Sequence, residues 1–252
     1  MAMIDFHSHI LPFIDDGSSS IEMSLNMLAD SYNQGVTTVV ATPHCYLMKD
    51  SSIDVFINNR KKSFDALTEA IKRDERTFPE IRLGCELRII KEIDDMKSLE
   101  KLCIEGTDYI MVEMPYKDWD VNYYDFLYEM ILRNLHPIMA HIERFWNHKK
   151  DFNNLYSLDL LYQVNAESFI KSPFKRYIPK LFEDGAIHII GSDMHDMKVR
   201  PSYMKKAADT IIKVYGEKRL DYLMKNAENV LNNKNVKGKN FPKMSFFENL
   251  KI

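Results

Sequence analysis

Residues 4–9 have the sequence Ile4-Asp5-Phe6-His7-Ser8-His9, a short apolar segment that ends in two histidines one residue apart. Alternate residues of a β-strand point to the same side, so both imidazoles would project together from the tip of a buried strand. Two neutral imidazoles aimed at one point favour a transition metal. A polar cluster without a metal explains the pair equally well, so the decision depends on ligands elsewhere in the chain.

The composition is that of an ordinary globular protein. The chain has 252 residues, 45% of them hydrophobic, and a net charge of −3, and its length is typical of one α/β barrel. This charge gives no support for binding to nucleic acid or to a membrane surface. No apolar run approaches the ~20 residues of a membrane span, and we expect no signal peptide. Cys45, Cys85 and Cys103 form no CxxC pair and no even framework, which favours reduced thiols in a cytoplasmic protein.

Apolar strand-like segments alternate with helical ones about seven times along the chain, a pattern read from hydrophobic periodicity. Strands are predicted near residues 4–6, 37–41, 81–85, 109–112, 137–140, 161–164 and 187–191. Helices are predicted near residues 21–32, 53–71, 124–132, 177–182, 204–214 and 220–231. A capping box formed by Ser19 and Glu22 would open the first helix, and Gly35 would cap its end. This alternation predicts parallel strands with helical crossovers, closed or nearly closed into a barrel.

The alternation stops near Asn232. We therefore predict one domain over residues 1–231 and a polar C-terminal tail over residues 232–252.

Six of the seven predicted strands end in a histidine or a carboxylate. These residues are His7, His9, His44, Glu86, Glu113, His141, Asp193 and His195. The C-terminal ends of parallel strands form the active face of α/β folds, so we expect these side chains to converge. Histidine and carboxylate ligands without cysteine favour Mn, Fe or Zn in a hydrolytic site. Bridging carboxylates would hold two metals ~3.5–4 Å apart, which suits displacement at phosphorus.

Each of these residues also has an ordinary structural interpretation. Glu86 and Glu113 would then pair with lysines, and His141 would be a buried structural histidine. A carboxylate at the end of an apolar strand is costly unless it is paired or bound to a metal, which favours the metal site. Arg144 and Arg200 follow two of the predicted ligands on the same rim, where a guanidinium fork suits phosphate. The alternative for both is an ordinary surface arginine.

Other catalytic chemistries lack their motifs. A cysteine-dependent phosphatase needs an arginine six residues after its cysteine, and Ser51, Lys91 and Tyr109 occupy those three positions. No GxGxxG, GxxxxGK[ST] or GxSxG sequence occurs, so nucleotide-cofactor redox chemistry is not expected.

Several motifs occur in order between about residue 3 and about residue 231. They are Ile4-Asp5-Phe6-His7-Ser8-His9, Asp15-Asp16-Gly17, Thr42-Pro43-His44, Gly84-Cys85-Glu86, Val112-Glu113, Ile138-Met139-Ala140-His141-Ile142-Glu143-Arg144 and Gly191-Ser192-Asp193-Met194-His195. With these motifs the chain resembles the PHP (polymerase and histidinol phosphatase) superfamily. Within it, the chain is most similar to the bacterial manganese-dependent protein-tyrosine phosphatases of capsule and exopolysaccharide loci. The resemblance implies an α/β fold of the PHP type, a distorted (β/α)7 TIM-like barrel.

The resemblance also implies a three-metal site that holds Mn²⁺, with Fe or Zn as alternatives. The implied ligands, metal by metal, are His7, His9, Glu86 and Asp193; Glu86, Glu113 and His141; and Asp16, His44 and His195. Glu86 would bridge the first two metals. Asp15 is adjacent to Asp16 and equally acidic, but Asp16 precedes Gly17 as the ligand of the family does.

The resemblance further implies that a metal-activated hydroxide hydrolyses phosphotyrosine while Arg144 and Arg200 bind the phosphate. The implied partner is a tyrosine kinase of polysaccharide export, and the implied role is regulation of capsular or exopolysaccharide synthesis. A small-molecule phosphatase of the histidinol-phosphate type would use the same site. A metal-binding scaffold without turnover is a third interpretation, against which stands the fact that every ligand position is filled.

Overall fold

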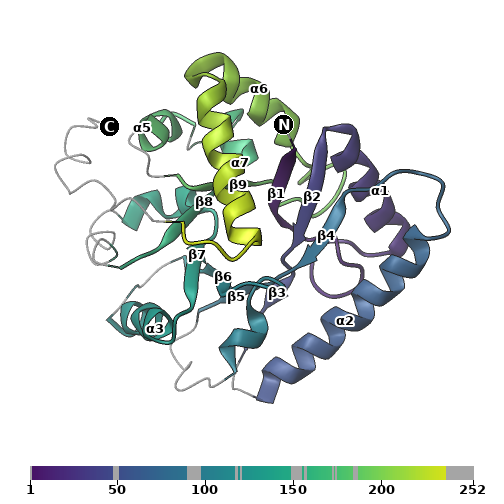
Figure 1. Ribbon diagram of the computed structural model, residues 1–252, viewed down its shortest axis with the longest axis horizontal. Coiled ribbons are helices and arrows are strands. Elements are labelled where there is room, and N and C mark those ends of the chain that lie inside the picture. The colour runs from purple at the N-terminus through teal and green to yellow at the C-terminus, as the bar shows by residue number, and fades with distance from the viewer. Residues whose placement is uncertain are drawn as a thin grey trace.

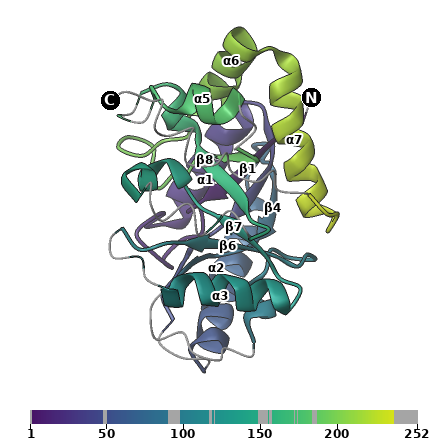
Figure 2. The ribbon, with the colours of Figure 1, turned by 90° about the vertical axis from the view of Figure 1, so that its left-hand side faces the viewer.

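The computed structural model describes residues 2–47, 51–89, 98–116, 119, 121–148, 155, 158–171, 173, 175–183 and 187–236. These residues form a mixed α/β fold in which parallel strands build a curved half-barrel with helices packed around it (Figure 1). A quarter turn of the molecule shows the same strands edge-on between the helices (Figure 2).

The strands belong to two hydrogen-bonded sheets. One has the order β1 (Met3–Ser8), β2 (Val36–Ala41) and β4 (Glu80–Leu83). The other has the order β3 (His44–Cys45), β5 (Glu86–Arg88), β6 (Tyr109–Glu113), β7 (His136–Met139), β8 (Leu161–Asn165) and β9 (Ile189–Gly191). Each described pairing is parallel, as the alternation of strand and helix predicts.

The strand predicted over residues 81–85 is wrong in one respect, because it is interrupted. β4 ends at Leu83 and β5 begins at Glu86, so Glu86 starts a strand instead of following one. Arg60, from the helix that crosses outside, donates from Nη1 to the Gly84 carbonyl at 2.6 Å and draws this carbonyl into a side-chain hydrogen bond. The N–H of Glu86 then donates to the Pro43 carbonyl at 3.0 Å, next to the pairing of β3 with β5.

Strand β9 lies beside β1, although the two are almost two hundred residues apart. Ser8 and Met194 form a parallel bridge, and the His9 N–H donates to the Met194 carbonyl at 2.9 Å. Gly191 permits this approach, because a Cβ at that position would lie 2.5 Å from the His7 Cβ. The first and the last strand therefore end at the same place.

The helices follow the predicted ranges closely. They are α1 (Ile21–Asn33), α2 (Ser51–Ile71), α3 (Val121–Leu132), α5 (Ile178–Glu183), α6 (Met204–Tyr215) and α7 (Glu217–Leu231), with 3₁₀ turns η1 (Leu99–Leu102), η2 (Ile142–His148) and η3 (Ala166–Phe169). The predicted capping box at Ser19 and Glu22 is wrong by one residue. Ser20 caps α1, since its hydroxyl accepts the Met23 N–H at 3.1 Å. Gly35 does follow the helix with φ of +90°, a value that suits glycine.

The helices cover the outside of the strands. α1 and α2 pack together beside β2, α3 packs on β7, and α7 packs on β1 and β9 (Figure 1). All residues of β1, β6 and β8 are buried, which is typical of parallel strands covered on both sides. Cys45, Cys85 and Cys103 are buried free thiols, as predicted. None of the described helices is both long and apolar enough to cross a membrane.

The predicted tail begins directly after α7. Its first residues contact β6: the Tyr109 hydroxyl donates to the Lys234 carbonyl at 2.9 Å, and the Val236 N–H donates to the same hydroxyl at 3.0 Å. Residues 237–252 lie outside the described residues, so the division of the chain at residue 231 stays a prediction.

Candidate metal centre

The structure brings all nine predicted ligand residues into one cluster at the C-terminal ends of the strands. Ligand atoms within 4.8 Å of one another form three groups: His9, Asp16, His44 and His195; His7, His9 and Asp193; and His44, Glu86 and Glu113. His141 joins them through its Nε2, which lies 2.6 Å from Glu86 Oε1. Histidines and carboxylates that are far apart in the sequence thus share one small volume, as the ends of parallel strands require.

Three atoms of the cluster are spaced as ligands of a single ion. His7 Nε2 lies 3.2 Å from His9 Nε2 and 3.6 Å from Asp193 Oδ1, and His9 Nε2 lies 3.4 Å from the same Asp193 oxygen. Glu86 Oε2 lies 3.3 Å from His7 Nε2 and 3.4 Å from His9 Nε2. Ligands at zinc-like bond lengths of 2.0–2.2 Å in a tetrahedron stand roughly 3.3 Å apart. The separations of the His7, His9 and Asp193 atoms are therefore close to those expected around one metal ion.

Hydrogen bonds at Nδ1 of His7 and of His9 decide that Nε2 of each ring faces the proposed metal position. His7 Nδ1 lies 3.2 Å from Gln163 Oε1, and His9 Nδ1 lies 2.7 Å from Asp15 Oδ2. Both partners are acceptors, so Nδ1 of each ring carries the proton in the neutral imidazole. The two Nε2 lone pairs then face each other at 3.2 Å. Two acceptors at this distance are stabilised by a cation between them, which is the ordinary arrangement of metal-binding histidines.

The pKa values of the cluster reflect the same crowding. Burial alone would lower the pKa of His9, but the hydrogen bond with Asp15 and the carboxylates of Asp193 and Glu86 raise it well above its ordinary value. Burial alone would raise the pKa of Glu86 and of Asp193, yet the neighbouring His7 charge helps to hold both well below the ordinary range. The carboxylates stay ionised inside the fold, where a divalent cation is a stronger partner than a protonated imidazole.

Glu86 connects two parts of the cluster. Its Oε2 faces His7 and His9, while its Oε1 lies 2.6 Å from His141 Nε2. Glu86 is fully buried, and its Oε2 also lies 2.9 Å from His44 Nδ1. Burial and the Arg144 charge lower the pKa of His141 to about 4, so this imidazole is neutral and offers a lone pair. A carboxylate with one oxygen toward each group has the placement of a bridging ligand.

Glu113 completes this side of the cluster. Its Oε1 lies 3.6 Å from His141 Nε2, and its Oε2 accepts from Arg88 Nη1 at 3.1 Å. Among the described residues, Glu86 and Glu113 pair with histidines and with this arginine, which favours the metal site over the alternative of pairing with lysines.

The adjacent residues Asp15 and Asp16 have different environments. Asp16 Oδ1 lies 3.3 Å from both His44 Nε2 and His195 Nε2, and its side chain is 65% exposed. Asp15 is buried behind His9 and accepts the His44 N–H at 2.9 Å. Although burial alone would raise the pKa of Asp15, its hydrogen bond with His9 lowers it to about 2. Asp16 therefore faces the cluster, while Asp15 orients a histidine from behind.

Two residues of the cluster have strained backbones. His141 and Asp193 have φ values of 34° and 54°, in the left-handed region that few residues other than glycine adopt. His141 lies two residues after β7 and Asp193 two residues after β9, and each turns its side chain into the cluster. Strain of this kind persists only where the surroundings over-determine it, and it is concentrated at functional sites.

Both arginines predicted to bind phosphate reach the rim of the cluster through Asp193. Arg144 Nη2 contacts Asp193 Oδ2, and Arg200 Nη2 donates to Asp193 Oδ1 at 2.9 Å. Arg200 Nη1 also lies 4.0 Å from Asp16 Oδ2. Arg144 lies in the 3₁₀ turn η2. Each guanidinium has five donors and these contacts use few of them, so both side chains retain donors for an anion.

Sequence reasoning missed two residues of β8, the strand that ends in no predicted ligand. Gln163 Oε1 accepts the His141 N–H at 2.7 Å, and Gln163 Nε2 donates to Asn165 Oδ1 at 2.9 Å. Asn165 Nδ2 donates in turn to Asp193 Oδ2 at 2.8 Å. β8 thus fixes ligands that come from β1, β7 and the end of β9. The available signal was a pair of amide side chains at alternate positions of an otherwise apolar strand.

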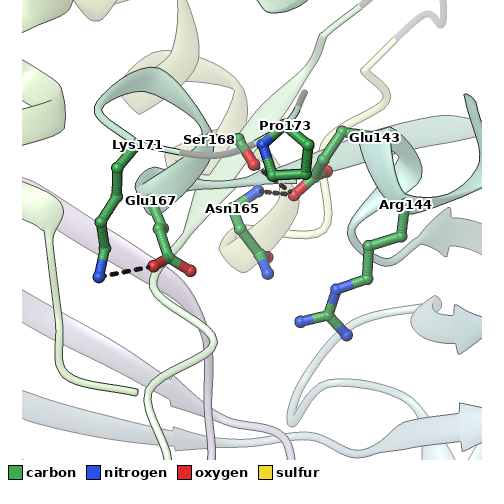
Figure 3. A pocket seen from close by; sticks show the side chains of 7 residues that line it. All are labelled: Glu143, Arg144, Asn165, Glu167, Ser168, Lys171 and Pro173. Atoms are coloured by element: carbon green, nitrogen blue, oxygen red, sulfur yellow. Dashed lines mark hydrogen bonds and ion pairs between the residues drawn. The ribbon is translucent and has the colours of Figure 1, made fainter. Parts of the chain in front are cut away.

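A cleft of about 390 Å³ opens beside the cluster. Figure 3 shows its lining residues, which are Glu143, Arg144, Asn165, Glu167, Ser168, Lys171 and Pro173. Glu143 is buried, and its Oε1 accepts from the Asn165 N–H at 3.1 Å and from Ser168 Oγ at 2.9 Å. Burial raises the pKa of Glu143 to about 7. Because Arg144 belongs to both places, the cleft and the metal cluster form one continuous region.

Comparison with known proteins agrees with this geometry. A family model described as capsular polysaccharide synthesis, CpsB/CapC, matches residues 3–232. The tyrosine-protein phosphatase CpsB of Streptococcus agalactiae is 28% identical over 246 residues, which are 92% of this chain and 99% of that protein. The tyrosine-protein phosphatase YwqE of Bacillus subtilis is 27% identical over 248 residues, 93% of each chain.

A solved structure is similar over nearly the whole fold. It comes from work on YwqE of Bacillus subtilis and CpsB of Streptococcus pneumoniae, described as unique metal-dependent tyrosine phosphatases. It superimposes with a TM-score of 0.77 at 26% identity and covers 94% of this chain and 97% of its own.

Proposed function

We propose, from the finding that this chain belongs to the CpsB/CapC family of capsular polysaccharide synthesis, that it is a metal-dependent phosphatase acting on phosphotyrosine in proteins. One observation carries the proposal: buried ligand atoms of His7, His9 and Asp193 lie 3.2–3.6 Å from one another, and Glu86 Oε2 lies 3.3–3.4 Å from both histidines. Relatives that match most of the chain are tyrosine-protein phosphatases, and the similar solved structure is described as metal-dependent.

We assign the metal ligands as the nine residues of the cluster. They are His7, His9, Asp16, His44, Glu86, Glu113, His141, Asp193 and His195. Three divalent ions fit this set, and a donor set of nitrogen and oxygen without sulfur suits manganese, with iron or zinc as alternatives. Metal ions bound there would lower the pKa of a water molecule and offset the charge of the phosphate oxygens. Asp16 is the ligand and Asp15 is not, because Asp15 already serves His9 and the His44 N–H.

Arg144 and Arg200 bind the phosphate oxygens in this proposal. Both are anchored on Asp193, which holds the two guanidinium groups beside the cluster. A guanidinium held in this way loses little side-chain entropy when it binds an anion. The leaving group is a phenolate, and because the pKa of tyrosine is about 10 it departs without a strong general acid. The cleft beside Arg144 offers room for the residues that flank the phosphotyrosine.

We also infer that the two sheets are parts of one distorted seven-stranded barrel of the PHP type. If β2 continues as β3, and β4 continues as β5, the strands follow one another in chain order. The bridge between Ser8 and Met194 then brings the last strand back to the first. Such a barrel would place every ligand on one rim.

The substrate we propose is a tyrosine kinase of polysaccharide export, and the role is regulation of capsular or exopolysaccharide synthesis. The match to a capsule-synthesis family supports this partner. We place the protein in the cytoplasm, where buried free thiols such as Cys45 and Cys85 are ordinary.

Turnover on a phosphotyrosine peptide tests the proposal. We expect hydrolysis to stop after treatment with a chelator, to return with Mn²⁺, and to resist alkylation of thiols. Activity that survives exhaustive chelation, or that His141→Ala leaves unchanged, would contradict it. Histidinol phosphate serves as the competing substrate, and a far larger kcat/KM on that compound would instead identify a small-molecule phosphatase on the same site.

A further inference from the structure

We propose that Tyr46 and Tyr116 form a subsite that binds the aromatic ring of an aryl phosphate, and that this subsite discriminates against alkyl phosphates. The inference rests on the proposed phosphatase function, and it concerns how the same site would select aryl over alkyl phosphates. Neither tyrosine is a metal ligand or a phosphate-binding residue in that proposal.

Tyr46 lies directly above one of the ligand groups. It follows β3, two residues after His44, and its ring centroid lies 5.3 Å from that of His44 at an interplanar angle of 30°. The side chain is nevertheless 59% exposed. Partial burial, together with the charges of Glu113 and Glu86, raises the pKa of Tyr46 to about 12, so its hydroxyl stays neutral beside the cluster.

Tyr116 lies at a second place on the same rim. It follows β6, three residues after Glu113, and its side chain is 50% exposed. Arg144 Nη1 donates to its hydroxyl at 3.5 Å, and the guanidinium carbon of Arg88 lies 5.7 Å from its ring centroid. Tyr116 is therefore in contact with one of the arginines to which we assign phosphate binding.

Both rings lie beside the same group of candidate ligands. Tyr46 packs on His44, and Arg88, which lies over the Tyr116 ring, donates to Glu113 at 3.1 Å. Ligand atoms of His44, Glu86 and Glu113 lie within 4.8 Å of one another. The two exposed rings therefore flank one part of the metal cluster.

This placement favours an aryl ester as the occupant. The ring of an aryl phosphate is one oxygen away from phosphorus, so a phosphate held by the cluster and Arg144 brings that ring to the rim where the tyrosines lie. Aromatic pairs prefer offset or edge-to-face contacts and gain more than the burial of their area alone. An alkyl phosphate would fill the phosphate site without contacting either tyrosine ring.

The test compares two stable inhibitors that share the phosphonate group. Benzylphosphonate carries a ring and methylphosphonate does not. Their affinities for the Mn²⁺-loaded protein are measured by calorimetry, and their inhibition constants are measured with 4-nitrophenyl phosphate as substrate. We expect Tyr46→Ala and Tyr116→Ala each to weaken benzylphosphonate about three- to tenfold and to leave methylphosphonate within about twofold of wild type.

Two kinds of variant serve as controls. Tyr46→Phe and Tyr116→Phe keep the rings and should retain benzylphosphonate affinity, which separates the ring from the hydroxyl contact with Arg144. Tyr128→Ala removes a tyrosine that is equally exposed, at 50%, but lies on the outer helix α3, and it should change neither affinity.

Two outcomes would overturn the inference. In the first, both alanine variants bind the two phosphonates as wild type does. In the second, both phosphonates weaken to the same extent, which would show damage to the phosphate site instead of loss of a ring contact. A wild-type protein that binds benzylphosphonate more tightly than methylphosphonate but does not hydrolyse a phosphotyrosine peptide would contradict the proposed function and leave the subsite supported.

Discussion

Replacement of Gln163 by leucine should weaken metal binding, although Gln163 would touch no metal. Its Oε1 accepts the His141 N–H at 2.7 Å and faces His7 Nδ1 at 3.2 Å, while its Nε2 donates to Asn165 at 2.9 Å. Leucine fills a similar volume and makes none of these hydrogen bonds. The His141 N–H and the side-chain oxygen Oδ1 of Asn165 would remain buried without Gln163 as partner, and His7 would lose the acceptor that fixes its tautomer.

The size of the effect follows from these contacts. Loss of a hydrogen bond behind a metal-binding histidine typically costs ten- to a hundredfold in metal affinity, about 1.4–2.7 kcal/mol. A buried donor or acceptor without a partner costs about 1–3 kcal/mol of folding free energy. We therefore expect Gln163→Leu to bind Mn²⁺ at least tenfold more weakly by calorimetry and to unfold at lower urea concentration in its metal-free form.

Asn226→Leu is the matched control. Asn226 is also a buried amide, and its Nδ2 donates to the His188 carbonyl at 3.0 Å, but it lies on α7 away from the metal cluster. This variant should lose stability without losing affinity for Mn²⁺. The reasoning fails if Gln163→Leu binds Mn²⁺ as wild type does, or if the two variants lose metal affinity equally.

Three further predictions concern the rest of the site. Glu143→Gln should weaken the pH dependence of folding stability. Burial raises the pKa of Glu143 to about 7, so the stability linked to its protonation is fully present below about pH 4.5 and is lost as pH rises through 7. Urea denaturation should therefore show a larger gain in free energy of unfolding over wild type at pH 8 than at pH 5. Arg144→Lys should lower kcat/KM on a phosphotyrosine peptide roughly tenfold or more, because an ammonium replaces a two-pronged donor, and steady-state kinetics with unchanged metal content would confirm a role in phosphate binding. Gly191→Ala should lower the free energy of unfolding by about 1–3 kcal/mol, since its Cβ would lie 2.5 Å from the His7 Cβ, and an unchanged denaturation midpoint would contradict this packing.

The convergence of the strand-end histidines and carboxylates could be predicted because their placement depends on local rules, whereas Asp16 was implied only by the family resemblance. His7 and His9 follow from the two-residue period of a strand, and Glu113 and His141 follow from their position directly after an apolar run. Parallel pairing then places all strand ends together, whatever the details of the helices. The half-barrel confirms the expectation of parallel strands with helical crossovers.

The features that sequence reasoning missed depend on neighbours that are distant in the chain. The interruption between β4 and β5 accompanies a hydrogen bond from Arg60, which lies in α2. Ser20 and not Ser19 caps α1, and Asp16 and not Asp15 faces the cluster. In each pair the two residues are of the same type, so the sequence does not show which of them the backbone turns into place. No periodicity carries that information.

The net charge of the proposed site explains why β8 carries amides, Gln163 and Asn165, and not carboxylates. Three divalent ions would face four carboxylates, those of Asp16, Glu86, Glu113 and Asp193. With neutral histidines, the six positive charges of the ions exceed the four negative charges of the carboxylates by two. A phosphate monoester carries about −1.5 to −2 charges at pH 7, so it closely balances that excess. A carboxylate in place of Gln163 would cancel part of the excess and weaken the attraction for the substrate. An amide fixes the same histidine without adding charge. This is a physical reason for buried amides, and not carboxylates, on β8, which lies between β7 and β9.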